Sequence, residues 1–202
     1  MKIKSNVILL LIAESLALLA TLTSIPAIAK ITALSSTLAF LALAGLIITI
    51  IALCRLRKVS GHFTVALWIV IASLILETVG LIISAISIAG ETANKTLQIV
   101  GSSLILLATI STVFDVYEEL NGFNQYLESN GYEKKAAYTK SVLWIYGCMV
   151  AIYIICNLAL FINSIAVNEQ LALALSIAAV VAMVVAEIVY IVYLARLLKN
   201  DK

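Results

Sequence analysis

Long apolar stretches separated by charged residues run through the whole chain. Six such stretches occur, at residues 5–29, 31–54, 63–90, 96–114, 141–168 and 170–195. A helix that crosses a hydrocarbon core of about 30 Å needs roughly 20 apolar residues, so each stretch is long enough to span a membrane. Strands of a membrane barrel would instead alternate over about ten residues, and runs such as 41–53 and 178–185 do not. The pattern predicts an all-α integral membrane protein, a bundle of six transmembrane helices.

The basic residues predict how these helices are oriented. Six spans bring both termini to one side, and Lys and Arg are retained on the cytoplasmic side of a membrane. This arrangement leaves only Lys30 and Lys95 on the outer side. The basic residues on the other side are Lys2, Lys4, Arg55, Arg57, Lys58, Lys134, Lys135, Lys140, Arg196, Lys199 and Lys202. We therefore predict a protein of the cytoplasmic (plasma) membrane with both termini inside.

Each pair of spans returns the chain to the cytoplasm, so residues 1–202 read as one domain of three helical hairpins. Their approximate bounds are 1–60, 61–122 and 138–202. A shift of 76 residues places Trp68-Ile69 on Trp144-Ile145, and Val116-Tyr117 on Val192-Tyr193. These matches fit a repeated hairpin, and equally a shared use of aromatic residues at the membrane interface.

Residues 118–140 form the one long polar segment. Phe123, Tyr126 and Leu127 follow the i, i+3, i+4 spacing of an amphipathic helix, and Asn130-Gly131 predicts a turn. We expect a cytoplasmic amphipathic linker that lies along the membrane surface.

A secretory signal peptide is an alternative for the first stretch, because Ala27-Ile28-Ala29 matches an A-x-A cleavage site. Glu14 interrupts the apolar run, and the run is long for a signal peptide. We therefore expect the first stretch to remain as a span.

Composition supports a membrane protein and excludes several functions. Hydrophobic residues make up 63% of the 202 residues and charged residues 12%, unlike a soluble domain, and a net charge of +2 does not indicate nucleic acid. Three cysteines without paired spacing predict neither a disulfide framework nor a zinc site. Motifs of metalloproteases, serine hydrolases and P-loop proteins are absent from the sequence. We expect no enzyme activity, no cofactor and no bound metal.

Carboxylates inside the predicted spans are the unusual chemistry of this chain. Glu14, Glu77 and Glu187 each interrupt an apolar stretch, and an acid at a helix centre costs roughly 2.5 to 3.5 kcal/mol on insertion scales. The sole histidine, His62, lies at a span boundary, so no basic residue inside the membrane can pair with them. Each acid must then be protonated, hydrated or bound to a cation.

We rank Glu77 and Glu187 as the principal ligand- or ion-binding residues, with Glu14, Asn157 and Tyr153 assisting. Asp115 is a weaker candidate because it lies near a cytoplasmic helix end. Tyr153 and Asn157 share one helix face at i, i+4, although Asn157 fits a role in helix packing equally well.

The leading hypothesis is a proton- or cation-linked transporter or channel with H⁺ or a cationic solute as ligand. A homo-oligomer is compatible with this hypothesis. The alternative is a non-transporting membrane partner, namely an immunity, assembly or regulatory subunit that binds another membrane protein. A third hypothesis, an intramembrane enzyme acting on lipid, requires two acids within reach of one lipid bond.

Overall fold

The computed structural model describes residues 3–21, 32–89, 95–166 and 168–199, which form helices and no strand. The helices are α1 (Lys4–Ala20), α3 (Thr32–Leu56), α4 (Gly61–Ala89), α5 (Lys95–Ser129), α6 (Glu133–Ala166) and α7 (Glu169–Leu198). The Ala27-Ile28-Ala29 segment of the alternative signal-peptide interpretation lies outside the described residues. The prediction of an all-α protein is confirmed for the part of the chain that the structure describes.

Five helices, α3 to α7, are long and apolar enough to cross a membrane. Their surfaces carry large apolar side chains, such as Phe40 at 73% and Trp144 at 79% exposure, which suit contact with lipid rather than water. These helices fit a polytopic membrane protein in a lipid bilayer. The sixth span, over α1 with its 17 residues, and the cytoplasmic side of the termini stay predictions.

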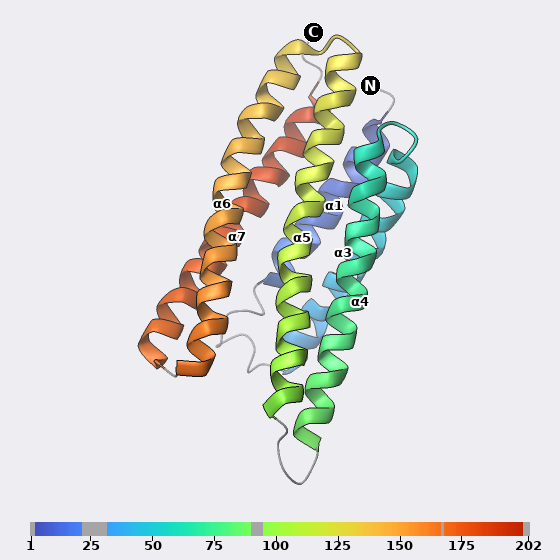
Figure 1. The fold of residues 1–202 in the computed structure, drawn as a ribbon. Coiled ribbons are helices and arrows are strands. Elements are labelled where there is room, and N and C mark those ends of the chain that lie inside the picture. The colour runs from blue at the N-terminus through green and yellow to red at the C-terminus, as the bar shows by residue number, and fades with distance from the viewer. Residues whose placement is uncertain (1–2, 22–31, 90–94, 167, 200–202) are drawn as a thin grey trace.

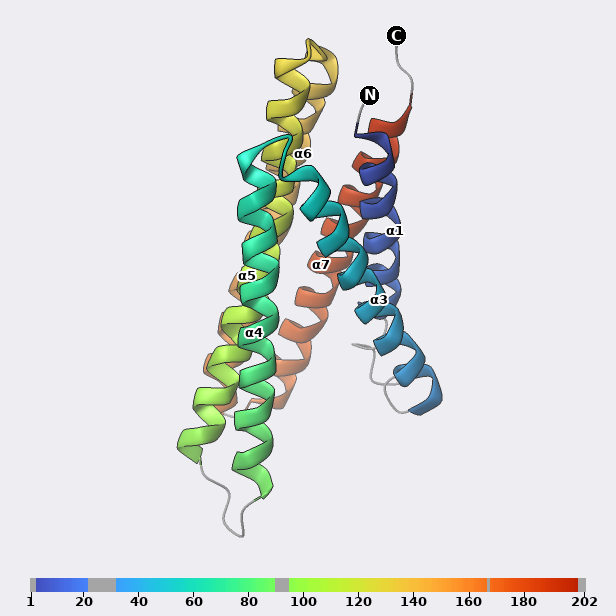
Figure 2. The ribbon, with the colours of Figure 1, turned by 90° about the vertical axis from the view of Figure 1, so that its right-hand side faces the viewer.

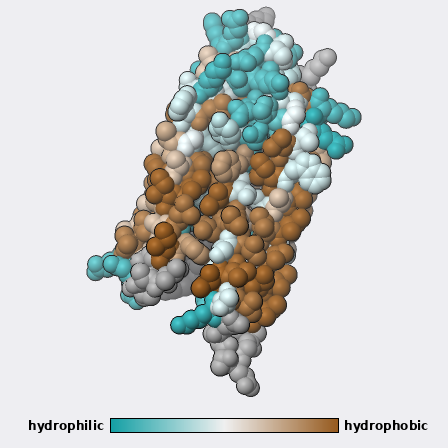
Figure 3. Space-filling model, viewed as in Figure 1, coloured by the Kyte–Doolittle hydropathy of each residue, from teal (hydrophilic) through white to brown (hydrophobic). Residues whose placement is uncertain are grey.

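The helices pack most extensively in the pairs α1 with α3, α4 with α5, and α6 with α7. Further contacts join α5 to α6, α1 to α7, and α3 to α4. The start of α1 and the end of α7 lie at the same end of the bundle (Figures 1 and 2). Hydrophilic residues gather at this end, and apolar surface covers most of the length below it (Figure 3). We call it the polar end, and the end where α6 meets α7 the opposite end.

One buried stripe runs along the second half of α5. Val113, Val116, Leu120, Phe123 and Leu127 repeat every three or four residues and are all buried. The stripe continues through the polar segment, so α5 runs unbroken to Ser129.

The segment 118–140 therefore differs from the amphipathic linker that the sequence suggested. It consists of the end of α5, a turn at 130–132, and the start of α6, and it forms no separate helix. Gly131 adopts a φ of 74°, a left-handed conformation that glycine accepts readily.

The residues that matched at a shift of 76 positions are only partly alike in their exposure. Trp68 and Trp144 are both highly exposed, at 64% and 79%. Tyr117 is 42% exposed, whereas Tyr193 is fully buried. The tryptophans thus occupy similar positions on the surface, and the tyrosines do not.

Candidate functional site

Four carboxyl groups from three helices come together inside the bundle. They belong to Glu14 on α1, Asp115 and Glu119 on α5, and Glu187 on α7. The other three all lie close enough to Glu14 to act on it electrostatically. Glu119 is only 1% exposed and Glu187 only 6%. We call these four residues the carboxyl cluster.

The hydrogen bonds of the carboxyl cluster leave two buried oxygens unpaired. The Tyr190 hydroxyl donates to Oε2 of Glu119, and the backbone N–H of Val116 donates to Oδ1 of Asp115 at 2.6 Å. Oε1 of Glu119 and Oε2 of Glu187 accept no hydrogen bond. A buried acceptor without a partner costs free energy of folding. A proton, a water molecule or a cation at these oxygens would remove that cost.

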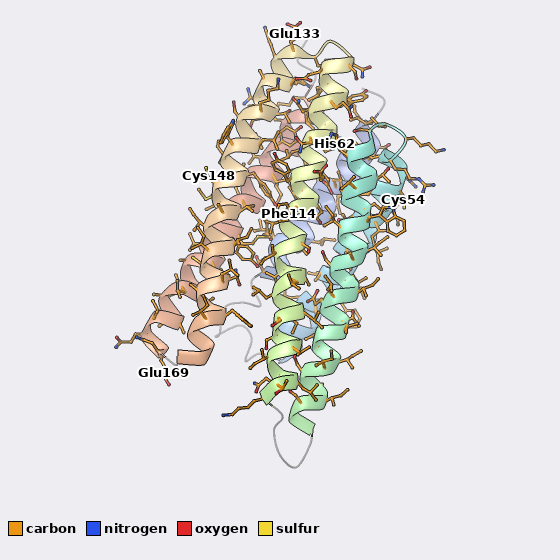
Figure 4. The ribbon with its side chains drawn as sticks, viewed as in Figure 1. Cys54, His62, Phe114, Glu133, Cys148 and Glu169 are labelled. Atoms are coloured by element: carbon orange, nitrogen blue, oxygen red, sulfur yellow. The ribbon has the colours of Figure 1, made fainter. Side chains whose placement is uncertain are left out.

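No basic side chain compensates the carboxyl cluster in the part of the chain that the structure describes. The two ion pairs there join Nδ1 of His62 to Oε2 of Glu118 at 2.6 Å, and Nζ of Lys140 to Oε1 of Glu128 at 2.8 Å. Phe114, the neighbour of Asp115, marks the level of the cluster on α5, and His62 lies between that level and the polar end (Figure 4). The cluster therefore keeps its own negative charge unless protons or other cations occupy it.

Buried aromatic rings extend from the level of the carboxyl cluster toward the polar end. The ring centroid of Phe123 lies 5.0 Å from that of Phe63 and 6.1 Å from that of Tyr193. Tyr193 stacks on Tyr190 at 6.2 Å, and Tyr190 packs against Tyr146 at 6.4 Å. These five rings, which we call the aromatic plug, come from α4, α5, α6 and α7. They separate the cluster from the cytoplasmic side of the predicted topology.

A cavity of about 390 Å³ lies on the other side of the carboxyl cluster. It extends from Glu187 toward the opposite end of the bundle, between α6, α7 and the end of α1. The lining residues are Thr21, Tyr153, Asn157, Leu160, Ser176, Ala179, Val180, Met183 and Glu187. We call it the Glu187 cavity.

The depth of the cluster follows from its position along α7. Glu187 lies 18 residues after Glu169, where α7 begins, which corresponds to about 27 Å of helix. Tyr146 packs against Tyr190 close to this level, and the highly exposed Trp144 precedes it by two residues. Exposed Trp side chains favour the membrane interface. These positions favour a cluster near the boundary of the hydrocarbon core on the side of the polar end.

The structure brings together four of the five site residues selected from the sequence. Glu14 and Glu187 belong to the carboxyl cluster, and Glu187, Tyr153 and Asn157 line the same cavity. Nδ2 of Asn157 donates to the backbone oxygen of Tyr153 at 2.9 Å, which ties these two residues together.

Glu77 lies apart from this group, exposed on α4. The sequence placed it on one face with Ser73, Gly80 and Ser87, and these three are buried. Leu76, rather than Glu77, continues their face toward the interior, because one residue along a helix turns the side chain by about 100°. Binding by Glu77 stays a prediction.

Glu119 is the cluster residue that the sequence reasoning missed, because it belongs to the polar segment after Tyr117. Two signals could have found it. Glu119 lies one turn after Asp115, and the buried positions Val116 and Phe123 lie three residues before and four after it.

Comparisons with protein-family models, curated proteins and solved structures gave no match. Fold and site together thus define the class: an all-helical protein with membrane-length apolar helices and a buried group of acids. Within the described ranges, no three His, Cys, Asp or Glu side chains lie close enough to hold a metal ion together.

Proposed function

We propose that the protein is a proton- or cation-linked transporter or channel, with the carboxyl cluster as its ion-binding site. One observation carries the proposal: Oε1 of Glu119 and Oε2 of Glu187 are buried among four acids and accept no hydrogen bond. A structural role alone would be served by Gln or Ser at lower insertion cost. Acids in this setting exchange protons or cations, because only those ligands relieve both the burial of charge and the mutual repulsion.

The surroundings of the cluster support a controlled path. The Glu187 cavity lies between the acids and the opposite end of the bundle. The rings of the aromatic plug pack on the side of the acids that faces the polar end. If the polar end is cytoplasmic, the ion enters from outside through the Glu187 cavity, binds at Glu187, and passes on to Glu14 and Glu119. Release to the cytoplasm then requires movement of the rings of Tyr190 and Tyr193.

The test is ion flux into proteoliposomes that contain the full chain. A pH-sensitive dye inside the vesicles reports proton movement driven by a potassium diffusion potential, and replacement of Na⁺ by K⁺ or choline outside tests other cations. We expect Glu187→Gln and Glu119→Gln to lose at least tenfold in flux. Glu169→Gln is the matched control, because Glu169 is an exposed acid on the same helix α7.

Two outcomes would contradict the proposal. Wild-type flux no greater than that of empty vesicles would favour the non-transporting membrane partner. Full flux through Glu187→Gln and Glu119→Gln would exclude the cluster as the ion site. Glu77→Gln tests the remaining sequence prediction, because a selective loss there would place ion binding on the exposed face of α4.

A further inference from the structure

We propose that the Glu187 cavity binds a small organic monocation, a protonated amine with an apolar body. This inference rests on the proposed function, because it names the class of solute that the carboxyl cluster would handle. The observation behind it is a buried acid, Glu187, in the wall of a cavity of molecular size.

The charge of the ligand follows from Glu187. Its side chain is 6% exposed, it lines the cavity, and its Oε2 accepts no hydrogen bond. An ammonium group donates up to three hydrogen bonds and carries the complementary charge. Anions are disfavoured, because Glu14 lies within electrostatic reach of Glu187, and Asp115 and Glu119 lie within reach of Glu14.

The size of the ligand follows from the volume of the cavity. At about 390 Å³ the cavity falls in the lower part of the range of about 300 to 1,000 Å³ that is typical of small-molecule sites. A bare Na⁺ or K⁺ would leave most of this space to water. An organic molecule with a few carbon atoms fills it.

The residues that line the Glu187 cavity include both polar and apolar side chains, so the cavity suits a ligand with a charged group and an apolar body. Leu160, Ala179, Val180 and Met183 offer an apolar surface for a hydrocarbon body. Asn157 and Ser176 contribute oxygen atoms that accept from N–H groups, and the aromatic ring of Tyr153 attracts a cation. A site of this kind selects an amine over a neutral alcohol by charge and over a metal ion by its apolar walls.

Binding of such a cation is balanced by loss of a proton. If Glu187 holds a proton before the amine arrives, the ammonium ion takes its place and the proton leaves to water. The O–H bond of the acid breaks, a new O–H bond forms on water, and no other covalent bond changes. Amine binding and proton release then occur in a ratio of one to one.

Butylammonium chloride is the probe for the test, with 1-butanol as its neutral analogue and sodium butyrate as its anionic analogue. Isothermal titration calorimetry on the purified full chain in lipid nanodiscs measures binding. We expect saturable binding of butylammonium alone, at least tenfold weaker in Glu187→Gln and unchanged in Glu169→Gln. Equal binding to Glu187→Gln and the wild type would overturn the proposal, as would equal binding of 1-butanol.

A second variant keeps the proposal testable if Glu187→Gln fails to fold. Val180→Trp fills the cavity and retains all four carboxyls, so it should abolish butylammonium binding in protein that elutes and melts like the wild type. Undiminished binding to Val180→Trp would overturn the site.

The two proposals can fail separately. Proton flux that depends on Glu119, without butylammonium binding to the wild type, would overturn the amine site and leave the transport function. Butylammonium binding that requires Glu187, without flux of any ion, would support the site and overturn transport.

Discussion

The hydroxyl of Tyr190 on α7 donates a hydrogen bond to Oε2 of Glu119 on α5, although 71 residues separate them in the sequence. Both side chains are buried, with 0% and 1% exposure. The backbones of α5 and α7 make no close contact within the described ranges, so side chains bridge the space between these helices. Two long helices from different hairpins are therefore joined at the level of the carboxyl cluster.

Tyr190→Phe should destabilise the protein by about 1 to 3 kcal/mol, because both oxygens of Glu119 would then be buried without a donor. Unfolding of the protein in detergent micelles, followed by circular dichroism, measures the change. Tyr117→Phe is the matched control, since Tyr117 lies on α5 and is 42% exposed. Equal stability of Tyr190→Phe and Tyr117→Phe would show that the bond between α7 and α5 contributes nothing.

Gly101→Ala should cost roughly 1 to 3 kcal/mol through overpacking between α4 and α5. A Cβ at Gly101 would lie 2.9 Å from the backbone oxygen of Gly80, an atom that cannot move alone. The melting temperature in micelles reports the effect. Gly147→Ala on α6 is the control, because nothing lies within 4 Å of its added Cβ and alanine favours the helix. A melting temperature for Gly101→Ala at or above that of wild type would contradict the close approach.

Gly131→Ala should cost about 1 to 2 kcal/mol for a different reason, namely its φ of 74° in the turn between α5 and α6. Nothing lies within 4 Å of the added Cβ, so the loss is conformational and not steric. Gly131→Asn should lose less, because Asn tolerates this conformation better. The order Gly, Asn, Ala in melting temperature is the expected result, and Ala equal to Gly would contradict it.

Butylammonium affinity should rise with pH if protons and amines compete for Glu187. The titratable groups that interact electrostatically with Glu187 are Glu14 from α1 and Tyr146 and Tyr153 from α6. Asp115 and Glu119 from α5 act in turn on Glu14, and Tyr190 on α7 donates its hydroxyl hydrogen to Glu119. At low pH the carboxyls hold protons and the amine must displace one. As pH rises the acids ionise, so affinity increases by at most about tenfold per pH unit for one proton exchanged.

Calorimetry between about pH 5 and pH 8 tests this, because an aliphatic amine stays protonated throughout, like a lysine with a pKa of about 10.4. Affinity that is constant or falls with pH would contradict the exchange. Measurement in buffers of different ionisation enthalpy gives the number of protons released per amine.

The helices could be predicted because each apolar stretch is long, and hydropathy depends only on local sequence. The site could be predicted only in part, because burial of an acid depends on which helix face meets a neighbour. Glu77 and Glu187 both interrupt apolar runs, yet Glu77 is exposed and Glu187 is buried. Glu119 was overlooked because the residues around it are polar, although the buried stripe through Val116 and Phe123 passes beside it.

The turn at Gly131 lies at the tip of a long helical hairpin, so it moves further than the acids do when α5 tilts. Helix α5 continues for ten residues from Glu119 to its end at Ser129, which is about 15 Å of continuous helix beyond the level of the acids. A tilt of α5 by about 10° at Glu119 would displace its tip by roughly 3 Å, by the geometry of a helix that rises 1.5 Å per residue. The hairpin of α5 and α6 would therefore amplify a small tilt into a larger displacement of its tip. A fluorescent or spin label on the turn at Gly131 would report a tilt of α5 at the buried acids.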